Sequence, residues 1–132
     1  MSDITSQTLT SLVKNIKEKK LSSEEVTKAF VDRSEKSKEL NAYITEDFSN
    51  AIDKAKKFDE KPNLDLKLPG IPMAVKDLFC TKDIRTTAGS KILENFVPTY
   101  ESTVTQNIWN EGGILLGKLN CDEFAMGSSN ET

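Results

Sequence analysis

Apolar positions recur with helical spacing through the first sixty residues of the chain. Residues 9–16 carry one such stripe, and residues 47–58 carry another that ends before Pro62. Between them, Ser22 and Glu25 have the spacing of a capping box, which predicts that a helix begins there. The lysines and glutamates between the apolar positions fit a solvated outer face. We therefore expect packed helices in a scaffolding role.

Strand patterns and glycines mark the rest of the chain. All six glycines lie at or after Gly70. Apolar residues alternate over 40–44 and 71–75, and Ile114-Leu115-Leu116 open a further buried segment over 114–118, so three strands are predicted. A helix is expected over 102–111. Because that helix joins the last two strands, they should form a parallel pair in an α/β fold.

These patterns divide the chain into two parts. Residues 1–62 are predicted to form a helical region, and residues 63–132 to form the start of an α/β core within one incomplete domain. The length of 132 residues suits a single domain, and 36% hydrophobic with 30% charged residues is typical of a folded, soluble protein. The net charge of −3 gives no basic surface for nucleic acid, so any RNA-related role would work through partners.

Composition also excludes several chemistries. The chain has no histidine, so neither a Ser-His-Asp triad nor a histidine-bearing metalloprotease helix can form within it. Cys80 and Cys121 form no Cys-x-x-Cys pair and are expected to be reduced thiols in the core. No secretory signal and no apolar run of membrane-spanning length, roughly 20 residues, occurs, which favours a cytoplasmic location.

Lys76 is the leading candidate for chemistry. It follows directly on the predicted strand over 71–75, and burial there would disfavour its charged form and prepare it as a general base. The alternative is a strand-end lysine that reaches into water. Asp77 comes next and, by strand alternation, should point away from Lys76 and stabilise the adjoining loop.

Residues 112–119 nearly match a phosphate-binding loop. Leu119 stands where that motif needs a hydroxyl, and here the glycines follow a helix while the apolar run is itself the strand. We therefore expect no nucleotide at this segment. Lys118 should point from the strand end into a polar site or into solvent.

Three motifs in order give the chain a resemblance to the amidase signature family, and the resemblance covers nearly the whole chain. They occupy Gly70–Asp77, Thr86–Ser90 and Gly117–Ser129. The resemblance implies a mixed sheet flanked by helices. It also implies amide hydrolysis by a Ser–cis-Ser–Lys triad, in which Lys76 relays charge as the base for the nucleophilic serine through the bridging serine. Both serines would lie beyond residue 132.

The chain therefore departs from the family pattern. It has one of three triad residues, so it is expected to be part of a longer protein or a truncated product, inactive alone. The resemblance places further residues near the site or in its support, with packing or turn hydrogen bonds as the alternative. These are the 86–90 loop, Asn120, Glu123, Gly127, Ser128 and Ser129.

The run over 122–132 and the helical opening are similar to one branch of the family, the glutamine-hydrolysing subunits of tRNA-dependent amidotransferases. That likeness implies release of ammonia from glutamine and its use, with ATP, to convert Glu-tRNA(Gln) into Gln-tRNA(Gln) for protein biosynthesis. It further implies a heterotrimer whose partner subunit binds the nucleotide and uses ATP and magnesium. No cofactor or metal is expected on this chain, and no membrane contact.

Two alternatives stay open from the sequence. The parent could be another amidase of the same family, or the chain could be a non-catalytic α/β module that binds a partner through its charged helices. The gene sequence past Thr132 separates the enzyme from the module. A serine- and glycine-rich segment there would favour the enzyme.

Overall fold

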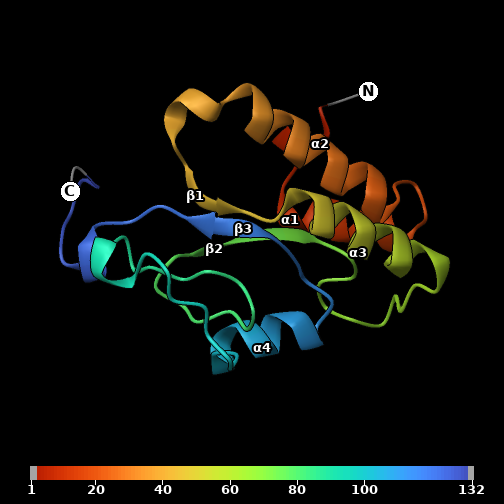
Figure 1. Ribbon diagram of the computed structural model, residues 1–132. Coiled ribbons are helices and arrows are strands. Elements are labelled where there is room, and N and C mark those ends of the chain that lie inside the picture. The colour runs from red at the N-terminus through yellow and green to blue at the C-terminus, as the bar shows by residue number, and fades with distance from the viewer. Residues whose placement is uncertain (1–2, 131–132) are drawn as a thin grey trace.

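A computed structural model of the protein describes residues 3–130. Three helices precede the second strand, and the fourth connects the last two strands (Figure 1). In chain order the helices and strands are α1 Leu9–Lys17, α2 Ser23–Lys36, β1 Tyr43–Glu46, α3 Phe48–Glu60, β2 Pro72–Lys76, α4 Thr103–Asn110 and β3 Ile114–Leu119. Short 3-10 turns lie at Ile4–Ser6, Lys38–Leu40, Lys91–Leu93 and Glu123–Ala125.

The three strands form one mixed sheet with β3 in the centre. β2 runs parallel to β3, and β1 runs antiparallel to it on the other side. Helices α1, α2 and α3 cover one face of the sheet, and α4 lies on the opposite side (Figure 1). The predicted parallel pair joined through a helix is therefore confirmed, as is the α/β class. Because β1 pairs with β3, the parts 1–62 and 63–132 share one sheet, and the proposed division between them stays a prediction.

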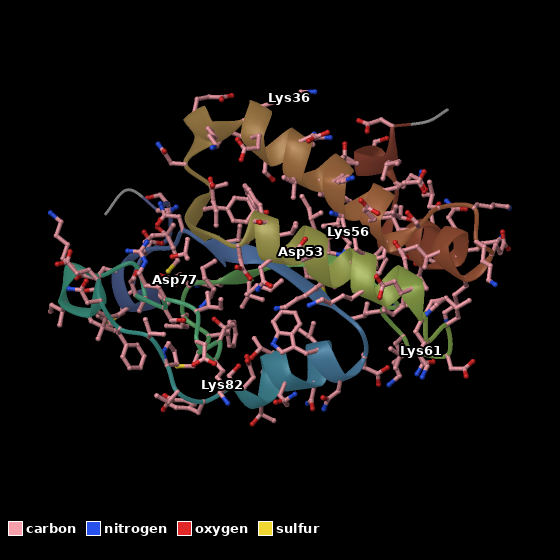
Figure 2. All side chains as sticks on the ribbon, turned by 45° about the vertical axis from the view of Figure 1, so that its right-hand side comes forward. Lys36, Asp53, Lys56, Lys61, Asp77 and Lys82 are labelled. Atoms are coloured by element: carbon pink, nitrogen blue, oxygen red, sulfur yellow. The ribbon has the colours of Figure 1, made fainter. Side chains whose placement is uncertain are left out.

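Apolar side chains fix the helical layer to the sheet. One buried cluster joins α2 and α3 to β3 and consists of Val31, Phe48, Ala51, Ala55, Ile114 and Leu116. A second joins α1 and α2 to the start of β2 and consists of Leu12, Ile16, Val26 and Ile71. Both alanines of α3 are fully buried, and such small side chains allow the helix to approach the strand closely. Charged side chains such as Lys36 and Lys56 lie on the outer surface of this layer (Figure 2).

The predicted capping box is present at the start of α2. The amide of Glu25 donates to Ser22 Oγ at 3.0 Å, and the Glu25 carboxylate accepts the amide of Ser22 at 2.8 Å. The Asp59 carboxylate of α3 accepts the next two amides, those of Ser23 and Glu24, at 2.9 and 2.8 Å. These bonds satisfy amides that a helix leaves without intrahelical partners, and they tie α3 to α2.

The first strand differs from its prediction over 40–44. β1 begins at Tyr43, whereas Leu40 lies in a 3-10 turn and is 70% exposed. Asn41 adopts a left-handed conformation with φ of 49°, which interrupts the extended run that the alternation suggested. The strand therefore starts after that turn.

Two irregularities shape the sheet. The β2–β3 register shifts between Met73 and Ala74, which leaves Leu116 as the extra residue, and the β1–β3 register shifts around Ile44. Gly117 follows the first shift, where a Cβ would collide with the carbonyl oxygen of Thr45. The close approach of β1 to β3 thus requires a glycine at this position.

Candidate active site at the carboxyl ends of the strands

Lys76 is the last residue of β2, and its side chain is exposed. It is paired in register with Leu119 of β3, and the amide of Asp77 donates to the Leu119 carbonyl at 2.9 Å. The backbone position of Lys76 is therefore fixed by the parallel ladder, while its amine is accessible. The expectation that the Lys76 amine is buried and neutral concerns the complete active site of the longer protein, and it stays a prediction.

Asp77 is fully buried and turned toward the following loop, as expected. Its Oδ2 accepts the amide of Thr87 at 2.9 Å and the Thr87 hydroxyl, and the amide of Gly89 lies 3.5 Å away. Its Oδ1 makes no hydrogen bond but lies 3.7 Å from Lys118 Nζ. One carboxylate thus holds the loop with one oxygen and faces a cation with the other.

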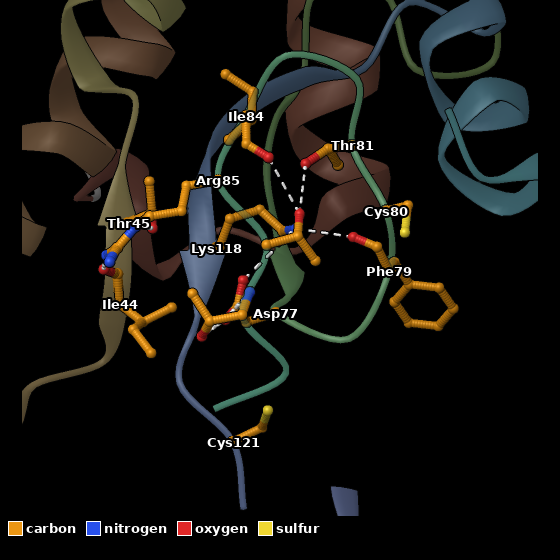
Figure 3. A network of polar contacts seen from close by, with 12 residues as sticks. Ile44, Thr45, Asp77, Phe79, Cys80, Thr81, Ile84, Arg85, Lys118 and Cys121 are labelled. Carbon is orange, nitrogen blue, oxygen red and sulfur yellow. Dashed lines mark hydrogen bonds and ion pairs between the residues drawn. The ribbon is translucent and has the colours of Figure 1, made fainter. Parts of the chain in front are cut away.

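The side chain of Lys118 points into a polar site, which was one of the two positions expected from the sequence; the other was solvent. It is completely buried at the end of β3, and its Nζ donates to the Phe79 carbonyl at 2.7 Å and to Thr86 Oγ1 at 2.6 Å (Figure 3). With the Asp77 carboxylate, three oxygen atoms surround the nitrogen. An ammonium group has three donors for them. Burial lowers the pKa of Lys118, and the nearby Asp77 charge opposes that shift.

Three consecutive residues connect one loop to all three strands. Arg85 reaches β1, where Nη2 donates to the Ile44 carbonyl at 2.6 Å and Nε donates to Thr45 Oγ1 at 3.1 Å. Thr86 accepts from Lys118 of β3, and Thr87 donates to Asp77 at the end of β2. The Arg85 bond also satisfies the carbonyl of the irregular β1 residue (Figure 3). We call residues 85–87 the strap.

Beyond the strap, the loop contacts the C-terminal run. The amide of Ala88 donates to the Asp77 carbonyl, and the Ala88 carbonyl accepts the amide of Phe124, at 2.9 and 2.8 Å. Ser90 donates to the Glu123 carboxylate at 2.6 Å. A Cβ on Gly89 would come within 2.5 Å of the Cys121 carbonyl oxygen, so this contact needs glycine. Hydrogen bonds therefore join the end of β2, the 85–90 loop and residues 120–126 to one another.

The structure separates the predicted supporting residues into two groups. Glu123 and the 86–90 loop are joined to the end of β2 by the bonds above. Asn120 is exposed; its amide donates to the Ala42 carbonyl, and its side-chain oxygen accepts the amide of Cys121. Gly127, Ser128 and Ser129 are exposed at the end of the described chain. Their roles in substrate binding or support stay predictions.

The interpretation of residues 112–119 as a strand, and not as a phosphate loop, agrees with the geometry. Gly112 follows α4, residues 114–119 form β3, and Lys118 is enclosed by protein oxygens. Within residues 3–130, no group of three or more metal-ligating side chains is found. No helix in that range is long and apolar enough to cross a membrane. Both cysteines are free; Cys121 is buried, Cys80 is partly buried, and burial raises the pKa of Cys121.

Sequence reasoning missed Arg85 and Thr81. Arg85 has no periodic signal because its partners lie on β1, far away in sequence. Thr81 is 1% exposed beside Thr86, and a buried threonine in a predicted polar loop has no local signature. The available signal for Arg85 was that a basic residue directly precedes Thr86-Thr87, which belong to one of the family motifs.

The comparisons with known proteins agree with this architecture. The profile described as "Amidase" matches residues 25–132. The chain belongs to the amidase family. An amidase family protein from Bacillus anthracis superposes with a TM-score of 0.82 at 30% identity, over 91% of this chain and 25% of that one. The 1.80 Å structure of the glutamyl-tRNA(Gln) amidotransferase A-subunit from Thermotoga maritima gives 0.71 at 29% identity, over 99% and 26%.

Two of the relatives by sequence carry the name of the glutamyl-tRNA(Gln) amidotransferase A-subunit. The glutamyl-tRNA(Gln) amidotransferase A-subunit of Pelagibacter ubique (strain HTCC1062) is 83% identical over all 132 residues. The protein of that name from Hyphomonas neptunium is 52% identical over the whole chain. In both cases this chain spans 27% of the relative's length.

Proposed function

We propose that this chain is the N-terminal part of the glutamine-hydrolysing subunit of a tRNA-dependent amidotransferase. The observation that carries the proposal is the 83% identity, without a gap in coverage, to the A-subunit of the Pelagibacter ubique enzyme. The subunit would release ammonia from glutamine, and a partner subunit would use it with ATP and magnesium to convert Glu-tRNA(Gln) into Gln-tRNA(Gln). The work would take place in the cytoplasm, within a heterotrimer.

In this proposal Lys76 is the base. A neutral amine at the end of β2 accepts a proton from a bridging serine, which in turn deprotonates the serine that attacks the glutamine amide. The accessible position of Lys76 leaves its amine open to hydroxyls that the rest of the subunit would supply.

The test uses a full-length chimera, in which residues 1–132 replace the matching segment of the Pelagibacter ubique protein, purified with its partner subunits. We expect it to hydrolyse glutamine, and Lys76→Ala to reduce kcat by at least about a thousandfold. Lys76→Arg should fail as well, because a guanidinium stays charged. Ammonia release is the measurement.

Two controls make the result specific. Lys82→Arg changes an exposed lysine of the adjacent loop and should leave glutamine hydrolysis intact. Ammonium chloride should still support amidation of Glu-tRNA(Gln) by the Lys76→Ala complex, since that step belongs to a partner subunit. Near-normal glutamine hydrolysis by Lys76→Arg would refute the role of Lys76 as a base. An inactive parent chimera would refute the proposed function.

A further inference from the structure

The buried Lys118 and Asp77 pair lies at the same end of the sheet as the proposed base, with its side chains on the opposite face from the exposed side chain of Lys76. Lys118 is paired in register with Val75, and Lys76 with Leu119, so the two lysines occupy neighbouring rungs of the ladder. Asp77 follows Lys76 in the chain, at a Cα separation of about 3.8 Å. Both members of the pair are 0% exposed, so water screens their charges little.

Stability alone does not account for this pair. Removing two charges from water is costly, and well-packed apolar side chains of similar volume often serve a fold equally well or better. Here the pair lies at the end of a strand whose other buried residues are apolar, including Ile114, Leu115 and Leu116. A charged pair at the one end that adjoins Lys76 therefore points to a role in the site.

The contacts divide that role between the two residues. Lys118 fixes the Phe79 carbonyl and Thr86, and Asp77 fixes the Thr87 amide and hydroxyl. Together they hold the strap against the end of β2. Asp77 also balances the charge of Lys118, since its Oδ1 faces only that ammonium among the described residues.

We propose that Asp77 and Lys118 are positioning residues that fix the strap at the end of β2 that carries Lys76, and that they keep the net charge at this end near zero. The inference rests on the proposed function of Lys76 as a base. Neither residue is proposed to touch glutamine.

The charge balance gives opposite expectations for the two single variants. Lys118→Met leaves the Asp77 carboxylate uncompensated, which favours the charged form of Lys76. Asp77→Asn leaves the Lys118 ammonium uncompensated, which favours the neutral form. The other titratable groups that act on Lys118 are Cys80 in the loop after β2 and Glu101 before α4, and Cys121 interacts electrostatically with Lys76. All three are unchanged in these variants.

The measurement is the pH profile of kcat/KM for glutamine in the full-length chimera. Its acid limb reports the group that must be neutral in the free enzyme. Lys118→Met should move that limb to higher pH by about one unit, and Asp77→Asn should move it to lower pH by a similar amount. The double variant Asp77→Asn/Lys118→Met should return the limb to the parent position. Its kcat should stay about tenfold low, because the strap has lost its anchors.

A second readout does not depend on activity. Amide hydrogen exchange at Thr87 and Gly89, followed by mass spectrometry, should quicken in all three variants because their acceptor or its support is altered. Val26→Ala is the matched control. It opens the α2 core cluster, away from the strap, and should shift neither the pH limb nor these amides.

The outcomes separate the two proposals. If the parent hydrolyses glutamine through Lys76 but both single variants shift the limb in one direction, or neither shifts it, the charge-balancing role is wrong. Unchanged exchange at Thr87 and Gly89 would overturn the positioning role. If the parent hydrolyses no glutamine, the proposed function fails, and the exchange experiment alone decides whether the pair positions the strap.

Discussion

The helical layer and the carboxyl end of the sheet are stabilised in opposite ways. In the helical layer the buried side chains are largely apolar, and ion pairs such as Lys28–Glu24 lie on the surface with side chains 52% and 31% exposed. At the carboxyl end the buried side chains are mainly polar and within 3% of full burial: Asp77, Thr81, Thr86, Thr87, Ser90 and Lys118.

The difference shows what each region must achieve. Apolar burial is non-directional, so it stabilises α1–α3 on the sheet without specifying each atom. A buried polar network is satisfied only in one arrangement, so it fixes the strap relative to Lys76. The scaffold should therefore tolerate conservative changes that the carboxyl end does not.

The largest expected effect is that of replacing Lys118 by methionine, and the same replacement at Leu116, another buried position of β3, is the comparison. In the full-length chimera, Lys118→Met should destabilise β3 locally by about 3–5 kcal/mol, because it leaves a buried carboxylate without its cation. Leu116→Met should cost less than about 1.5 kcal/mol, because the volume is nearly conserved. Amide exchange of the β3 peptide gives both values, and equal losses would abolish the distinction between the regions.

A smaller effect is expected at the start of α2. Ser22→Ala removes the cap of the Glu25 amide and should cost about 1 kcal/mol of local stability, seen as faster exchange of that amide. Ser49→Ala, on the exposed face of α3, is the matched control and should cost nothing. A loss at Ser22 as large as that at Lys118 would show that the helical layer also depends on directional bonds.

The smallest effect is expected for a surface ion pair. Lys28→Ala breaks the 2.6 Å contact with Glu24 on α2, and we expect no measurable change in Tm at physiological salt, because both charges stay hydrated and screened. The melt is repeated at low salt as a control. A clear drop in Tm at both salt concentrations would mean that exposed charges contribute to the scaffold after all.

Local patterns were sufficient for most of the secondary structure. The capping box set the start of α2, and the apolar runs gave β2 and β3 to within one residue at each end. Such features arise from neighbours in sequence, so they can be read without the fold. The first strand was misplaced because the left-handed turn at Asn41 is not visible in an alternation of apolar residues.

The site was only partly predictable, because sequence patterns record local features but not contacts between distant residues. Lys76 at the end of a strand, and Asp77 turned toward the loop, follow from position and alternation. Arg85 could not be assigned, because its partners on β1 are reached only after the sheet has formed.

The sequence by itself determined the elements, the parallel pair and the placement of Lys76 at its edge. The tertiary structure decided that Lys118 pairs with Asp77 and that the strap joins three strands. The physical reason is that periodicity records which face of an element is buried. Which buried polar groups meet depends on strand register and on irregularities such as the one at Leu116, and these are set by packing across the whole sheet.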